Sequence, residues 1–160
     1  MSDPQIGKWK QRGKIYLWQY IDNIKNYPGW NFAADEKACM SLINLIDLMK
    51  TATWPSSIIL NISAPTPKIL KVPNNKGGNA RWKTVGTFKL KYPKDQVDPD
   101  CWLFSLDSTK HQIQLTLGRS WLEALQQGIV DINKGKGDFS INPTLGNNQD
   151  EPLWFWWLNN

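Results

Sequence analysis

The sequence predicts an α+β fold, in which a largely antiparallel sheet of about five to six strands carries two helices packed on one face. Three observations predict this fold. Apolar residues recur at helical spacing in one segment before and one segment after the middle of the chain; the middle alternates apolar and polar residues; and short turns join consecutive alternating runs. Of the 160 residues, 41% are hydrophobic and 21% are charged, which is typical of a globular domain.

Residues 1–14 are predicted to form a flexible basic arm, and residues 15–160 a single α+β domain. The arm is polar and carries four basic residues, Lys8, Lys10, Arg12 and Lys14. Beyond it, no internal repeat and no long linker divide the chain, whose length is close to the commonest size of one domain.

The two helices are predicted from their apolar stripes and their ends. The first spans about 35–50, and its stripe consists of Cys39, Leu42, Ile43, Ile46 and Met49. The second opens at Ser120, which has the spacing of a capping box with Glu123. The glycines within 134–137 are expected to end it.

The strands are predicted from alternation and from β-branched and aromatic content. The run 15–21 has few polar positions on either face, so we expect a strand covered on both sides, with a short helix as the alternative. Alternating strands are predicted at 57–63, 84–92, 101–107 and 110–117, and shorter ones at 69–72 and 138–141. The third and fourth of these alternating runs flank a short polar turn, which predicts a hairpin.

Ten tryptophans are present, and most are expected in the core. The C-terminal group 154–157 consists of Trp, Phe, Trp and Trp. The absence of alternation favours a last strand buried on both faces and paired with 15–21. The alternative is that part of the group is displayed to a partner.

The N-terminus and the cysteines indicate the expected compartment. The chain begins without an apolar stretch after a basic start, and no run approaches the roughly 18 apolar residues of a membrane helix. We therefore expect a cytoplasmic protein with no membrane partner. Cys39 and Cys101 are expected to stay reduced and buried, with a disulfide or a zinc pair as the alternative. No cofactor or metal is predicted, because two thiols and one histidine supply too few ligands for zinc.

Charge is distributed unevenly along the chain. Residues 48–94 contain nine basic residues and no acidic one, whereas residues 95–160 contain nine acidic and four basic ones. Clustered cations beside aromatic rings suit a polyanion, because affinity grows with the number of neutralised phosphates and bases stack on the rings. The alternative is that the lysines only keep strand faces hydrated and discourage edge pairing. The predicted partner-binding residues are Lys68, Lys71, Lys76, Arg81, Trp82, Lys83, Lys89 and Lys91.

Residues suited to catalysis are few. His111 falls on the apolar face of the predicted strand at 110–117, which favours a structural role. Asp95, Asp98 and Asp100 could hold a hard cation, but the prolines around them favour a solvated turn.

These features favour a non-catalytic binding domain that engages a macromolecular partner, an unknown protein or a polyanion, through an aromatic and basic surface. One alternative is a nucleic-acid-binding protein that uses the basic segment 68–94. The other is a small enzyme without a standard motif.

Overall fold

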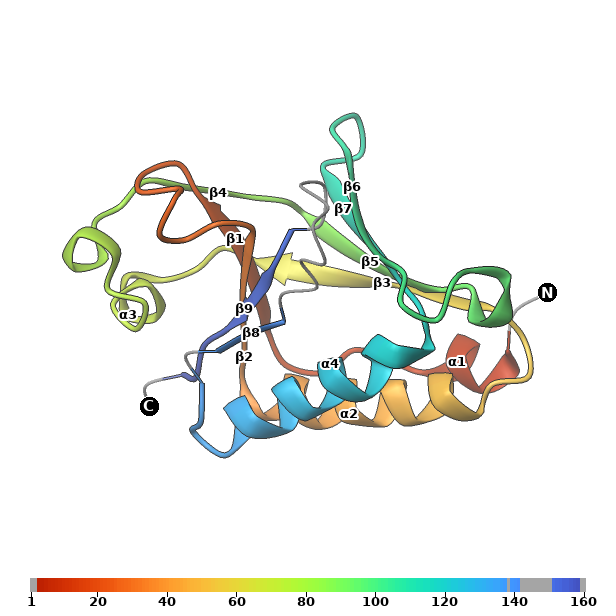
Figure 1. Ribbon diagram of the computed structural model, residues 1–160. Helices are drawn as coiled ribbons and strands as arrows, with labels where there is room; N and C mark the ends of the chain where they lie inside the picture. The colour runs from red at the N-terminus through yellow and green to blue at the C-terminus, as the bar shows by residue number, and fades with distance from the viewer. Residues whose placement is uncertain (1–2, 138, 142–150, 159–160) are drawn as a thin grey trace.

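The computed structural model describes residues 3–137, 139–141 and 151–158. Within these ranges, nine strands form one curled sheet, and two long helices lie together beneath it (Figure 1). The strands are β1 (Ile15–Tyr20), β2 (Trp30–Ala34), β3 (Ser56–Ser63), β4 (Trp82–Thr84), β5 (Thr87–Tyr92), β6 (Trp102–Asp107), β7 (Gln112–Leu117), β8 (Phe139–Ile141) and β9 (Leu153–Phe155). The helices are α1 (Pro4–Lys8), α2 (Glu36–Thr51), α3 (Pro67–Leu70) and α4 (Arg119–Asn133), with short 3₁₀ segments η1 (Asn75–Gly78) and η2 (Lys94–Gln96).

The sheet joins two halves at its centre. Its strand order is β6-β7-β5-β3-β1-β2-β9-β8, and β4 pairs with β1 further along that strand. Five of the eight pairings are antiparallel, and the parallel ones are β1–β3, β2–β9 and β5–β7. The predicted hairpin is confirmed, since β6 and β7 pair antiparallel from Trp102 to Asp107.

The mixed α/β composition is confirmed, whereas the expected count of about five to six strands and two helices is too small. β2 escaped prediction because every position in it is buried, so no alternation marks it. The expected strand 84–92 is divided, because β4 ends at Thr84 and pairs with β1, while β5 begins at Thr87 and pairs with β3 and β7.

Two further expectations about strands need correction. The segment 69–72 is not a strand: Pro67 begins the short helix α3, and the Thr66 hydroxyl accepts a hydrogen bond from the Ile69 amide. The C-terminal strand β9 pairs with β2 and not with β1, because the unpredicted β2 lies between them. Of the expected strand at 138–141, β8 is confirmed, and Asp138 lies outside the described residues.

The two long helices begin in different ways. The Asp35 carboxylate starts α2 by accepting a hydrogen bond of 2.9 Å from the Ala38 amide. The predicted capping box of α4 does not form, because Gly118 is the residue that precedes the helix and it has no side-chain cap. The Ser120 amide instead donates to the Pro99 carbonyl oxygen, and Glu123 forms an ion pair with Lys50 of α2.

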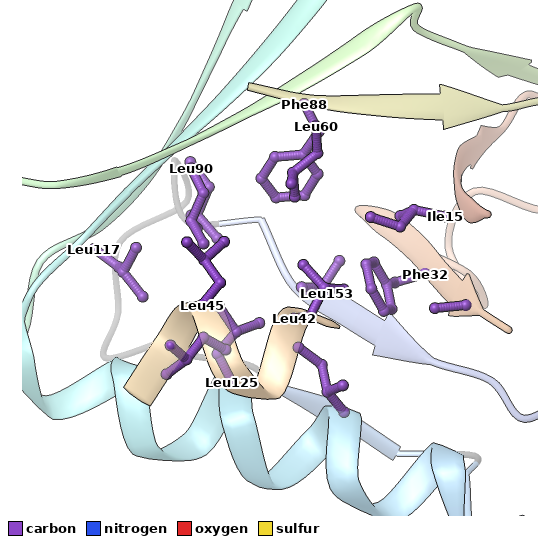
Figure 2. Packing of buried hydrophobic residues seen from close by; sticks show 14 of the residues in the cluster. Ile15, Phe32, Leu42, Leu45, Leu60, Phe88, Leu90, Leu117, Leu125 and Leu153 are labelled. Atoms are coloured by element: carbon purple, nitrogen blue, oxygen red, sulfur yellow. The ribbon is translucent and has the colours of Figure 1, made fainter. Parts of the chain in front are cut away.

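The main core lies between these helices and the sheet. In Figure 2, Leu42 and Leu45 of α2 and Leu125 of α4 point toward side chains of β3, β5 and β7 and of β1, β2 and β9. The labelled side chains from the sheet are Ile15, Phe32, Leu60, Phe88, Leu90, Leu117 and Leu153. Burying one such side chain contributes about 1.5–3 kcal/mol, so this layer supplies the larger part of the apolar stabilisation.

A second, aromatic cluster covers the opposite face of β1. Tyr16, Trp18 and Tyr20 alternate with the core residues of that strand and pack against Ile69 and Trp156. The segment that contains α3 and η1 supplies part of the cover. Both faces of β1 are therefore buried, as the sequence predicts, and the C-terminal aromatic group is buried or half-buried.

The state of the two cysteines and the length of the helices can be compared with what the sequence predicts. Cys39 and Cys101 form no disulfide. Burial raises the pKa of the Cys39 thiol to about 12, whereas Cys101 is only half-buried, which differs from the expected burial. Among the helices of the described residues, none is both long enough and apolar enough to span a membrane.

We expect Gly128→Ala to lower the free energy of unfolding by about 1 kcal/mol or more, measured by urea denaturation. The added methyl carbon in α4 would lie 2.9 Å from ring carbons of Phe155, and this crowding outweighs the gain of roughly 1 kcal/mol in helix propensity. Gly7→Ala in α1 is the matched control, because nothing lies within 4 Å of its new methyl carbon. Equal effects of the two substitutions would contradict the proposed packing.

Candidate functional site

The structure divides the partner-binding residues predicted from sequence between two regions. Lys68, Lys71 and Lys76 are exposed on the α3–η1 segment, and Arg81 follows just before β4. Figure 1 shows this segment at one end of the molecule.

The remaining predicted residues lie on strands. Trp82 of β4 is half-buried against the aromatic cluster, and Lys83 beside it is exposed. Lys89 and Lys91 lie on β5, on the sheet face that points away from the helices, since the alternate residues Phe88 and Leu90 are buried in the main core.

Two of the predicted cations are bound to the carboxylate of Asp22, which lies in the turn that follows β1. The Arg81 guanidinium lies 2.9 Å from Oδ1 of Asp22, and the Lys76 ammonium lies 3.7 Å from Oδ2. The Arg81 amide also donates to Asp22, at 2.9 Å. Hydrogen bonds from Arg81, followed by the charges of Arg81 and Lys76, lower the pKa of Asp22 to about 2. These two cations therefore hold the loop together and are partly neutralised.

Lys83 lies close to a second carboxylate, that of Glu151. The register places Lys83 opposite Gln19 of β1, and the Gln19 amide lies 3.5 Å from Oε2 of Glu151. Burial raises the pKa of Glu151, while a hydrogen bond from Trp30 and the charge of Lys83 act in the opposite direction. Lys83 therefore also compensates a charge of the protein itself.

A larger group of cations surrounds an open hollow of about 1110 Å³, which we call the N-terminal depression. It lies between the segment that follows α1 and the first half of α2. Its lining consists of Lys8, Trp9, Lys10, Arg12, Gly13, Glu36, Lys37, Met40, Ser41 and Asn44. Four of these side chains are cations and one is a carboxylate. Within the described residues, none of the four cations forms an ion pair.

Hydrogen bonds to α2 hold one wall of the depression in place. The indole N–H of Trp9 donates to the Ser41 carbonyl oxygen at 2.8 Å, and the Arg12 amide donates to the Ser41 hydroxyl at 3.3 Å. The Lys14 amide donates at 2.9 Å to the same Asp35 carboxylate that caps α2. The cations of this segment are therefore carried on a backbone that is bound to the helix.

Contacts with the main core and with β3 also attach the N-terminal segment to the rest of the fold. Ile6 of α1 is buried in the main core, and the Gln11 side chain pairs with both the amide and the carbonyl oxygen of Asn61 in β3, at 2.8 and 3.0 Å. The segment predicted as a flexible basic arm is thus packed against α2 and β3. Its sequence gave no indication of these contacts, because they join residues 21 to 50 positions apart.

The C-terminal end of α4 lies at the same end of the helix layer as the depression. The Asn133 amide nitrogen is 3.7 Å from the sulfur of Met40, which lines the depression. Lys134 and Lys136 follow Asn133 directly and are exposed. Three distant parts of the sequence thus bring cations to this end of the molecule.

Four charged groups around a second hollow are paired with one another. This hollow, of about 500 Å³, is lined by Lys50, Glu123, Arg119 and Asp95 among others, and these four form two ion pairs. The described residues contain no group of three or more side chains placed to hold a metal ion. His111 is exposed in the turn before β7, and not on its apolar face as expected.

Comparisons with known proteins give no guidance on this site. No model of a protein family matches the chain, and neither the curated proteins nor the solved structures contain a significant match. The function of the protein is therefore inferred from the geometry of the depression and from its charge.

We expect Gly13→Ala to lower the free energy of unfolding by about 2–5 kcal/mol, since it combines a strained backbone with a steric clash. At Gly13, φ is +72°, and the new methyl carbon would lie 2.1 Å from Oδ1 of Asp35 and 2.4 Å from the Ala38 nitrogen. Gly77→Ala is the control, because its φ is +66° but nothing lies within 4 Å. The control should lose only about 1–2 kcal/mol. A loss for Gly13→Ala no larger than that would refute the attachment of the segment to α2.

Asp22→Asn should remove an acid-sensitive part of the stability. The pKa of Asp22 is lowered in the folded protein from 3.8 to about 2, so its contribution is complete above pH 3.8 and is lost as the pH falls toward 2. Urea unfolding at several pH values between these limits should show a steeper decline for the unmodified protein than for the variant. Parallel curves would show that Arg81 and Lys76 do not stabilise this carboxylate.

Proposed function

We propose that the chain is a non-catalytic binding domain that engages a macromolecular polyanion through the N-terminal depression. One observation carries this proposal: four cations without ion-pair partners in the described residues surround one hollow beside a half-buried tryptophan. Cations gathered in this way attract counterions. A polyanion that replaces several counterions at once gains the entropy of their release.

Ion pairing distinguishes the cations of the depression from the cations in the segment 68–94 that the sequence favours. Lys76 and Arg81 bind Asp22, so a ligand would have to compete with this carboxylate. Lys8, Lys10, Arg12 and Lys37 form no ion pair within the described residues, and Glu36 is the one carboxylate in the lining that they share. Unpaired cations contribute more to polyanion affinity, because no intramolecular partner has to be displaced.

Four of the cations predicted from the sequence form no ion pair with any described residue, and they offer an alternative binding surface to the depression. Lys68 lies on α3 and Lys71 directly follows it, and Lys89 and Lys91 lie on β5. They supply the same number of charges as the depression but at two separate places, so one short polyanion would contact fewer of them.

A cytoplasmic location belongs to this proposal, since the two cysteines form no disulfide.

Salt dependence of binding tests the proposal. The affinity of the full chain for inorganic polyphosphate is measured by fluorescence anisotropy over a range of salt concentrations. We expect strong binding at low salt that weakens as salt increases. Replacing Lys8, Lys10, Arg12 and Lys37 together by Gln should make the slope of log affinity against log salt shallower by about 3.

The matched control replaces Lys68, Lys71, Lys89 and Lys91 by Gln, which changes the net charge equally. It should leave the slope within about 1 of that of the unmodified protein. A larger loss in the control would assign binding to the surface suggested by the sequence. No binding by the unmodified protein at low salt would overturn the proposal.

A further inference from the structure

We infer that the polyanion is a single-stranded nucleic acid, whose phosphates contact the cations of the depression and whose bases contact Trp9 and Met40. This inference rests on the proposed function and names the ligand of the same site. It uses the part of the lining that charge alone does not explain.

The depression has apolar side chains among its cations. Met40 is 57% exposed, although it is a large apolar side chain on the first half of α2. Trp9 is half-buried, and its N–H group is held by the Ser41 carbonyl oxygen at 2.8 Å, which fixes the orientation of the indole. A polarisable thioether and a fixed aromatic ring are good contacts for the flat face of a base.

Cations and aromatic surface also alternate along the wall of the depression. Lys8, Trp9 and Lys10 are consecutive, and Arg12 follows two residues later. Trp9 has an extended backbone, with φ −65° and ψ 140°, so neighbouring side chains point in different directions. Such a wall can offer a ring to a base while the flanking cations reach phosphates. A single strand presents the same alternation of base and phosphate.

The shape of the site distinguishes single strands from duplexes. A volume of about 1110 Å³ is slightly above the range of about 300–1,000 Å³ that is usual for one small molecule, and it suits a short piece of an extended chain. A duplex keeps its bases stacked inside and would present only phosphate and sugar to a hollow of this size. An unpaired strand can turn its bases outward onto aromatic and apolar side chains.

The test compares polyanions that do and do not present unpaired bases. The affinity of the full chain is measured at low salt for oligo(dT), for its duplex with oligo(dA), and for inorganic polyphosphate with the same number of phosphates. We expect oligo(dT) to bind at least about tenfold more tightly than either of the others, since base stacking adds to phosphate contact only in the single strand. A poly-glutamate peptide of equal charge should bind no better than polyphosphate.

Surface substitutions separate the contact with bases from the contact with phosphates. Met40→Ser should weaken the binding of oligo(dT) roughly fivefold or more and leave the binding of polyphosphate unchanged. Ile59→Ser is the matched control, because Ile59 is 54% exposed on β3, away from the depression. Circular dichroism verifies that each variant is folded.

The outcomes are distinguishable from those that test the proposed function. Equal affinities for oligo(dT) and polyphosphate, or equal effects of Met40→Ser and Ile59→Ser, would overturn the inference and leave polyanion binding intact. Tighter binding of poly-glutamate would identify an acidic protein as the ligand and also overturn it. If no ligand binds at low salt, the proposed function itself fails.

Discussion

The rest of the structure depends on β1, because both of its faces are buried and it joins the two halves of the sheet. It pairs with β2, β3 and β4, so it fixes where three parts of the chain lie. Leu17 faces the helices, while Trp18 and Tyr20 face the aromatic cluster. Covering that second face requires the segment between β3 and β4. The cations of this segment are consequently part of a structural cover, in which Asp22 holds Arg81.

The position of β1 also decides the course of the chain before it. Because β1 begins at Ile15, beside the start of α2, the preceding residues must run along the helix layer (Figure 1). Gly13 allows the turn with a positive φ, and Asp35 binds both the Lys14 amide and the first turn of α2. The contacts that fix the start of β1 against α2 therefore also form the wall of the depression. Fold stability and the proposed binding site are coupled at this junction.

The candidate site could be predicted only in part, because composition counts charges without their partners. The uneven distribution of charge pointed to the segment 68–94, where ion pairs with Asp22 occupy Lys76 and Arg81 and the half-buried carboxylate of Glu151 lies near Lys83. The basic residues near the N-terminus were visible in the sequence but had no apparent neighbours. Their importance follows from contacts with α2, and from Lys37, which no local pattern connects to them.

The sequence by itself determined α2, α4 and the β6–β7 hairpin, whose burial follows a local period, and the two-sided burial of β1, which follows from its lack of polar positions. Only the tertiary structure decided the pairing of β9 with β2, the helix α3 in place of a strand, and the choice of partner for each charge. The physical reason is the range of the interactions. Periodicity records which side of an element is buried, whereas strand order and ion pairs depend on groups far apart in the chain that meet only after folding.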